Sequence, residues 1–98
     1  MDLNTMIEKT FTINNKLGLH ARPAALFVQT SNRFESDVEV TKDGETVNGK
    51  SIMGIMTLAA GMGSQIHVKI TGADAKEAME ALEDLFDKNF GEEGGESS

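Results

Sequence analysis

Apolar and polar residues alternate along two segments of the chain, and this alternation predicts two β-strands. Between residues 6 and 15, Ile7, Phe11 and Ile13 occupy odd positions among threonine and charged neighbours. Residues 65–71 (QIHVKIT) alternate without interruption, with three β-branched aliphatic side chains on one face and four polar side chains on the other. A strand with this pattern is buried on one face only. Both segments therefore belong to a sheet with one exposed face.

A hairpin is predicted between these two segments. Val38 and Val40 alternate with acidic residues, and a return strand begins at residues 46–47. The dipeptide Asp43-Gly44, which lies between the two runs, is favoured in tight hairpin turns. The two runs are therefore expected to pair as antiparallel strands.

Helical spacing begins shortly after Gly18. Side chains that are apolar or small recur there at the spacing of one helix face. They are Ala24, Phe27, Val28 and Ser31. Pro23 fits only in the first turn of this helix, where a missing N–H group costs nothing. The helix is therefore predicted to begin close to His20.

Two further helices are predicted downstream. A short helix covers residues 52–60, with Ser51 as a favoured N-cap and Gly61 at its end, although a glycine inside it weakens its helix propensity. Asp74 and Glu77 form the pattern of a capping box ahead of the last helix. The apolar side chains of that helix include Ala78, Leu82, Leu85 and Phe86.

The predicted order of elements is β-α-β-β-α-β-α. Because the strands have one polar face, helices cover only the other face, and the fold class is an α+β open-faced β-sandwich. A chain of 98 residues suits a single domain, which we place at residues 1–90. Residues 91–98 contain only Gly, Glu and Ser, so they are predicted to form a disordered acidic tail.

Composition narrows the classes of function. Nine Lys and Arg residues against sixteen Asp and Glu residues give a net charge of -7, which repels nucleic-acid phosphates. The chain has no Cys, and therefore neither a disulfide nor a thiolate metal site. Residues 1–10 lack the apolar run of a secretory signal, and no segment approaches the roughly 20 apolar residues that span a bilayer. We therefore expect a cytoplasmic protein that binds no nucleic acid and does not insert into membranes.

His20 is the residue best placed for chemistry. It precedes the first predicted helix, next to unpaired backbone N–H groups and the positive end of the helix dipole. A neutral imidazole there has a ring nitrogen free to act as a nucleophile, and a phosphoryl group on it would receive N–H donors from the first turn. Arg22 can pair with phosphate oxygens through its planar guanidinium. Alternatively, His20 only ends a loop and Arg22 is a solvated charge, and spacing alone does not separate the two interpretations.

Ser51 and the residues that follow it form a second candidate site. Ser51 is either an ordinary N-cap or a position where a phosphate would be stabilised by the helix terminus. Ile52, Met53 and Met56 either form an adaptable apolar contact patch or help to fill the core. Both interpretations can hold for different residues of this helix.

Other kinds of chemistry are disfavoured. His67 lies on the polar face of its strand and is expected to face solvent. The chain has no GxSxG, P-loop or HExxH motif, and its two histidines are too few for a metal cluster. We therefore expect no metal and no cofactor.

Three segments of the sequence resemble the HPr family. They are residues 18–24 (GLHARPA), 48–54 (NGKSIMG) and 61–66 (GMGSQI). HPr is the histidine-containing phosphocarrier of the bacterial phosphoenolpyruvate-dependent sugar phosphotransferase system. The resemblance covers about residues 6–89, with the same order of elements. It implies a four-stranded antiparallel sheet with three helices on one face.

The resemblance also implies roles for individual residues. His20 matches the histidine that enzyme I phosphorylates on Nδ1 with a group drawn from phosphoenolpyruvate, and Arg22 matches the arginine that pairs with the phosphate. Ser51 matches the regulatory serine that an ATP-dependent HPr kinase/phosphorylase modifies. The positions that match the family's docking surface around the histidine are Ala21, Ala25, Ile52, Met53 and Met56.

The partners implied by the resemblance are enzyme I, the sugar-specific IIA components, HPr kinase/phosphorylase and a catabolite-control transcription regulator. The protein is expected to be a monomer that carries a phosphoryl group within a relay and is not itself an enzyme. Three alternatives stay open. The first is a nitrogen-related paralogue, which shares the His-Ala-Arg-Pro signature; the second is a regulatory binding module in which Ser51 is the working residue. The third is a hydrolase using His20, disfavoured because no second general acid or base is near in sequence.

Overall fold

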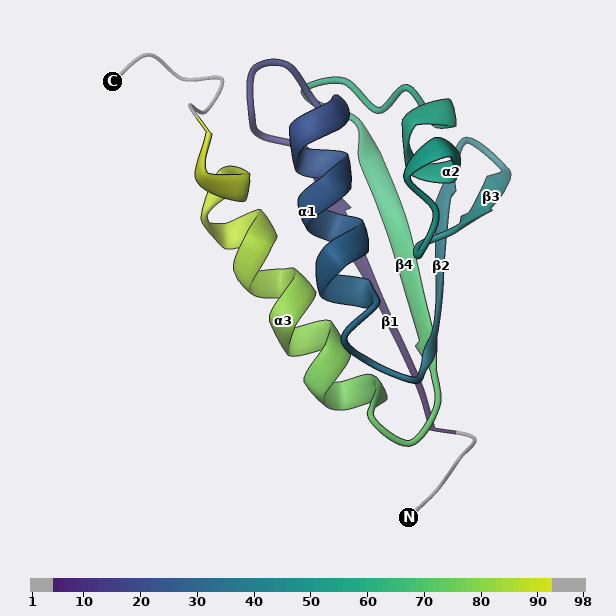
Figure 1. The fold of residues 1–98 in the computed structure, drawn as a ribbon. Helices are drawn as coiled ribbons and strands as arrows, with labels where there is room; N and C mark the ends of the chain where they lie inside the picture. The colour runs from purple at the N-terminus through teal and green to yellow at the C-terminus, as the bar shows by residue number, and fades with distance from the viewer. Residues whose placement is uncertain (1–4, 93–98) are drawn as a thin grey trace.

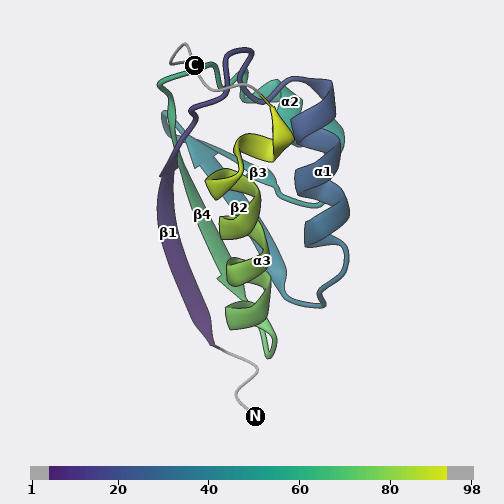
Figure 2. The same cartoon turned by 90° about the vertical axis from the view of Figure 1, so that its left-hand side faces the viewer.

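Four strands form one antiparallel sheet in the computed structural model, which describes residues 5–92. The strands are β1 (Met6–Thr12), β2 (Asp37–Lys42), β3 (Glu45–Asn48) and β4 (Gln65–Thr71), and their order in the sheet is β1-β4-β2-β3. The helices are α1 (Ala21–Ser31), α2 (Ile52–Thr57) and α3 (Ala75–Asp87), followed by the short 3-10 helix η1 (Asn89–Gly91). All of them lie on one side of the sheet (Figure 1, Figure 2). The predicted open-faced α+β sandwich is confirmed.

The register of the strands separates an apolar face from a polar one. Ile70 of β4 lies opposite Ile7 of β1 and Val38 of β2, and these side chains face the helices. On the other face, His67 lies opposite Thr10 and Thr41. Because directly opposed residues of antiparallel strands point to the same side, the alternation predicted from the sequence becomes one buried and one exposed face.

An aromatic cluster packs the C-terminal end of α3 against the rest of the core. The ring of Phe86 is stacked on Phe11 of β1, with centroids 4.1 Å apart, and meets Phe27 of α1 edge-on. Phe90 of η1 packs edge-on against the same ring at 5.0 Å and is almost fully buried. Offset and edge-to-face contacts of this kind add stability beyond the area that they bury. The cluster therefore fixes where the chain leaves α3.

Two predicted boundaries are wrong, and long-range hydrogen bonds explain both. β1 ends at Thr12 and not near residue 15, because Ile13 exchanges hydrogen bonds with residues 63 and 64 in the loop before β4. α2 ends at Thr57 and not at residue 60. The carbonyl of Ala60 is instead the acceptor for the N–H of Leu19, at 2.8 Å. Local sequence gives no sign of either pairing.

The predicted capping box ahead of α3 is also wrong. Asp74 is the N-cap residue of α3, but its side chain makes no capping bond. Its carboxylate instead accepts hydrogen bonds from the Ser36 hydroxyl and from the backbone N–H groups of Glu35 and Ser36. The pKa of Asp74 is lowered, chiefly by the Ser36 hydroxyl and then by the Glu35 N–H. The carboxylate therefore joins α3 to the loop before β2, and this contact is lost only as the pH falls through that lowered pKa.

The chain continues in described structure beyond residue 90. Gly91 ends η1, and the backbone N–H of Glu92 donates to the carbonyl of Asn89 at 2.8 Å. These are the first two residues of the predicted tail, and the other six lie outside the described residues. Among residues 5–92, no helix is long and apolar enough to cross a membrane.

Candidate functional site

His20 is the N-cap of α1, as the sequence predicted. Its backbone is extended, and its carbonyl accepts the first intrahelical hydrogen bond, from Ala24 at 2.9 Å. Pro23 has no N–H group, so the backbone donors ahead of that first bond are the N–H groups of Ala21 and Arg22. The imidazole is therefore carried by a helix end that presents donors to an anion.

A tight loop sets the position of His20. Asn15 accepts a hydrogen bond from the N–H of Gly18 and returns one from its side-chain amide to the Gly18 carbonyl at 2.6 Å. Gly18 has φ +70°, a conformation that glycine adopts without strain. The next residue, Leu19, is buried and donates to Ala60. These bonds fix the backbone directly before His20.

The imidazole of His20 is partly exposed and has one carboxylate neighbour. Its side chain is 35% exposed, and Nε2 lies 2.9 Å from both carboxylate oxygens of Glu92. Asn15 Nδ2 donates to Glu92 Oε1 at 3.0 Å. His20 also lines a shallow depression with Leu17 and Met56. The site thus combines an imidazole ring, a carboxylate and apolar side chains.

Glu92 is ionised at this site. Burial raises its pKa, but hydrogen bonds from His20 and Asn15, together with smaller effects of nearby positive charge, outweigh burial, and the net effect lowers the pKa. Arg22 and Glu92 line a common depression beside Lys16. Arg22 is exposed and forms no ion pair with any residue in the described range 5–92. Its guanidinium can therefore meet an incoming phosphate.

Ser51 is the N-cap of α2, as predicted. Its hydroxyl accepts a hydrogen bond from the N–H of Gly54 at 3.0 Å. Gly54 itself serves close packing, since a Cβ there would lie 3.3 Å from the Asn48 carbonyl and from Val47 of β3. Within residues 5–92, no hydrogen bond joins Ser51 to His20.

Helix α2 divides its side chains between the core and the surface. Ile55 is fully buried, and Leu58 after the helix is nearly so. Met53 is 76% exposed, and Ile52 and Met56 are about half-exposed. These three share one side of the helix, because their spacing is that of neighbours on a helix surface. We call the exposed side chains of Leu17, Ile52, Met53 and Met56 the apolar face.

The remaining predicted site residues fit this arrangement. Ala21 of α1 is exposed and Ala25 is half-buried, so both lie at the surface of the helix that His20 caps. His67 lies on the open face of the sheet, as predicted. Its Nε2 pairs with Glu8 at 2.7 Å and its Nδ1 with Thr10 at 3.1 Å. Among residues 5–92, no group of His, Asp and Glu side chains could hold a metal ion.

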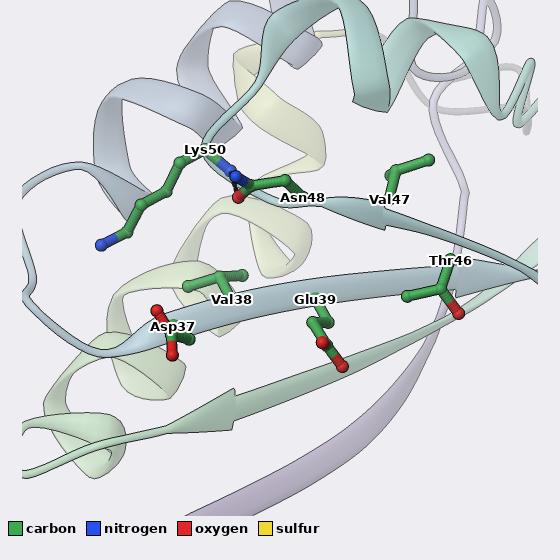
Figure 3. Close-up of a pocket in the computed structure, with 7 residues that line it drawn as sticks. All are labelled: Asp37, Val38, Glu39, Thr46, Val47, Asn48 and Lys50. Atoms are coloured by element: carbon green, nitrogen blue, oxygen red, sulfur yellow. Dashed lines mark hydrogen bonds between the residues drawn. The ribbon is translucent and has the colours of Figure 1, made fainter.

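A further depression, of about 360 Å³, lies along β2 and β3 (Figure 3). Asp37 and Glu39 supply its negative charge, while the ammonium of Lys50 donates to the Phe34 carbonyl at 2.7 Å. None of the residues that line it belongs to the predicted site, and it holds neither histidine.

Comparison with known proteins shows the family to which this chain belongs. The sequence profile described as "PTS HPr component phosphorylation site" matches residues 7–88. The chain belongs to the HPr family. It is 53% identical over 87 residues to the phosphocarrier protein HPr of Neisseria meningitidis, a match that covers 89% of this chain and 98% of the relative. It is 54% identical over 83 residues to the HPr-like protein Crh of Halalkalibacterium halodurans, covering 85% and 99%.

Solved HPr structures have the same fold. The crystal structure of HPr-C-His from Thermoanaerobacter tengcongensis matches with a TM-score of 0.86 and 53% identity, over 89% of this chain and 98% of that one. Sequence and fold therefore agree on the HPr family of the phosphotransferase system, which includes proteins named phosphocarriers.

Two residues of this HPr-family site are not predicted from the sequence. The Gly, Glu and Ser residues around Glu92 place it in the predicted tail, and Asn15 marks only the end of a predicted strand. The available signal is Phe90, since an aromatic side chain directly before the acidic segment indicates that the chain is still anchored to the core there.

Proposed function

We propose that this protein accepts a phosphoryl group from phosphorylated enzyme I on His20 and passes it to sugar-specific IIA components. The observation that carries the proposal is the position of His20 as the N-cap of α1, with a partly exposed ring beside free helix donors and Arg22. Membership of a family whose profile is described as a phosphorylation site supports the same assignment.

The arrangement supports transfer, and not hydrolysis, at His20. A phosphoryl group on the ring would be stabilised by the N–H groups of α1 and by the guanidinium of Arg22. The carboxylate of Glu92 is held to Nε2 of the ring by hydrogen bonding and so is not a free base for activating water. The phosphorylated histidine would therefore persist until an acceptor protein arrives.

The apolar face suits partner proteins that bind transiently. Met side chains adapt to differently shaped surfaces, and Met56 lines the same depression as His20. Exposed apolar residues around a reactive group favour a docking interface. We assign enzyme I and the IIA components to this one surface, so that they bind in turn.

Incubation with phosphoenolpyruvate and a catalytic amount of enzyme I tests the proposal. A carrier acquires one acid-labile phosphate per molecule, on His20, and releases little free phosphate. Continuous release of phosphate would indicate a hydrolase instead. Absence of both would indicate a regulatory binding protein.

Replacing Arg22 with lysine should slow phosphoryl transfer by roughly tenfold while leaving the protein folded. Lysine keeps the charge but loses the planar pair of donors that a phosphate accepts. Rapid-quench measurement of phosphate incorporation from enzyme I would give the rate. Equal rates for wild type and Arg22→Lys would show that only the charge matters.

We also propose that Ser51 is a site of regulatory phosphorylation by HPr kinase/phosphorylase. Its hydroxyl lies at the N-terminus of α2, and the same short helix bears Ile52, Met53 and Met56 of the apolar face. A phosphate there would place charge beside a surface that partners must desolvate. Similarity to Crh of Bacillus subtilis, whose solution structure is titled that of a catabolite repression HPr, supports a regulatory use of this family's fold.

Ser51→Asp, which mimics the phosphate, should weaken binding of enzyme I by about tenfold or more without lowering the melting temperature. An acidic side chain at the N-cap is favourable for the helix but unfavourable beside an apolar interface. Isothermal titration of enzyme I and thermal melts would separate the two effects. Ser51→Ala is the matched control, because it loses the cap, at a cost of about 1 kcal/mol, and adds no charge. If Ser51→Asp bound enzyme I with unchanged affinity, Ser51 would serve only as the N-cap of α2.

A further inference from the structure

The contact between Glu92 and His20 fixes which ring nitrogen carries the proton. A carboxylate with a lowered pKa can only accept hydrogen bonds, so Nε2 of His20, 2.9 Å away, must be the donor. In a neutral imidazole with a proton on Nε2, the lone pair is on Nδ1. The geometry therefore leaves Nδ1 as the nucleophilic atom.

Glu92 is held in place by its own segment of the chain. Asn89 and Phe90 have φ of 50° and 55°, a left-handed conformation that is costly for residues other than glycine. The buried Phe90 ring and the hydrogen bonds from Gly91 to Lys88 and from Glu92 to Asn89 maintain this turn. Such strain persists only where the surrounding packing determines it.

The buried side chain of Asn15 also holds the carboxylate of Glu92 in place. It donates to Glu92 Oε1 at 3.0 Å and to the carbonyl of Gly18 at 2.6 Å. It is 1% exposed, and its amide therefore has few other partners to choose from. The loop that positions His20 and the segment that carries Glu92 are thus joined through one side chain.

We propose that Glu92 is a positioning residue that keeps the proton on Nε2 of His20 throughout phosphoryl transfer and stabilises the positive charge that the ring acquires. This inference rests on the proposed function, in which His20 is the phosphoryl acceptor. It assigns a role to a residue that lies beyond the segment matched by the family profile, which ends at residue 88.

Phosphoryl transfer to and from Nδ1 of His20 needs no reactant other than the phosphoryl donor and the acceptor. The lone pair of Nδ1 forms the N–P bond while the bond between phosphorus and the donor breaks, and that bond's electron pair leaves with the donor. Because the His20 ring retains its Nε2 proton, it becomes positively charged, and the carboxylate of Glu92 faces that charge. When the group moves on to an acceptor, the N–P electron pair returns to Nδ1. Because Nε2 keeps its proton, the ring leaves as a neutral imidazole and not as an anion.

Glu92→Gln and Glu92→Ala test this role, with Glu80→Gln as the matched control. The glutamine variant keeps a neutral acceptor for the Nε2–H group of His20, whereas the alanine variant removes the acceptor. Glu80 lies on the exposed side of α3, so its replacement by glutamine changes the net charge equally without touching the site. Proton–nitrogen spectra of protein labelled in its histidine rings should show an exchange-protected Nε2–H of His20 in wild type and Glu80→Gln. That signal should be lost in Glu92→Ala.

Phosphoryl transfer from enzyme I should slow about tenfold in Glu92→Gln, because a neutral acceptor stabilises the charged ring less than a carboxylate does. Glu92→Ala should be at least as slow, and Glu80→Gln should match wild type. Equal or faster transfer in Glu92→Gln overturns the inference while the proposed function stands. An unprotected Nε2–H in wild type also overturns it. Failure of wild type to accept phosphate from enzyme I overturns both the inference and the proposed function.

Discussion

His20→Ala is expected to abolish phosphate acceptance from enzyme I while leaving the fold intact. The variant loses the proposed nucleophilic ring, and the neighbouring Arg22, whose guanidinium stays protonated, cannot replace it as a nucleophile. Stability should change by less than about 1 kcal/mol, because the ring is partly exposed and makes no helix-capping bond. Phosphate incorporation and thermal melts measure the two quantities.

His67→Ala provides the matched control for this prediction. It removes the other histidine, which lies on the open face of the sheet and pairs with Glu8 and Thr10. The rate of phosphate incorporation should equal that of wild type. If the two alanine variants lost activity to the same extent, His20 would not be the acceptor.

Gly18→Ala is expected to have the largest effect on stability, with a loss of about 3 kcal/mol or more in the free energy of unfolding. An alanine Cβ would lie 2.4 Å from the carbonyl oxygen of Ala60 and 2.7 Å from the Cα of Gly61. Both are backbone atoms, so relief requires breaking the bond from Leu19 to Ala60 that positions His20. Urea unfolding should show the loss, and the folded fraction should accept phosphate more slowly.

Gly44→Ala is the control that measures the cost of a left-handed alanine without the steric clash expected in Gly18→Ala. Gly44 has φ +83° in the hairpin turn, but a Cβ there would meet nothing within 4 Å. This variant should lose only the roughly 1–2 kcal/mol that a left-handed alanine costs. Equal losses in the two variants would show that the loop at Gly18 is not packed against residues 60–61.

Local sequence patterns are enough to predict an element when the environment of each of its residues follows from neighbouring positions in the chain. β4 has the predicted bounds, because each of its residues faces either the core or solvent and alternation reports that directly. The start of α1 at His20 follows from Pro23, whose ring restricts it to the first helical turn. The cap formed by Ser51 is predictable for the same local reason.

The hydrogen-bond partner of a carboxylate is not predictable from local sequence when several donors are available to it. Asp74 has the position and chemistry of a helix cap, yet it binds Ser36, which lies 38 residues earlier. Glu92 contacts His20 across 72 residues of sequence. In both cases a carboxylate selects among several donors, and only the packed fold brings the chosen donor within reach. The sequence therefore indicates the candidate histidine at the start of α1 but not the carboxylate beside it.

The direction of β1 matters for anyone who labels or immobilises this protein. A strand rises about 3.3 Å per residue, so the seven residues of β1 place its start roughly 20 Å from the loop that leads to His20. By contrast, Glu92 brings the other end of the described chain into contact with the imidazole itself. An affinity tag, fluorophore or surface linker ahead of β1 should therefore leave the apolar face accessible to the proposed partners. The same addition fused after Glu92 would be tethered beside His20, the proposed phosphoryl acceptor, and would compete with those partners for that surface.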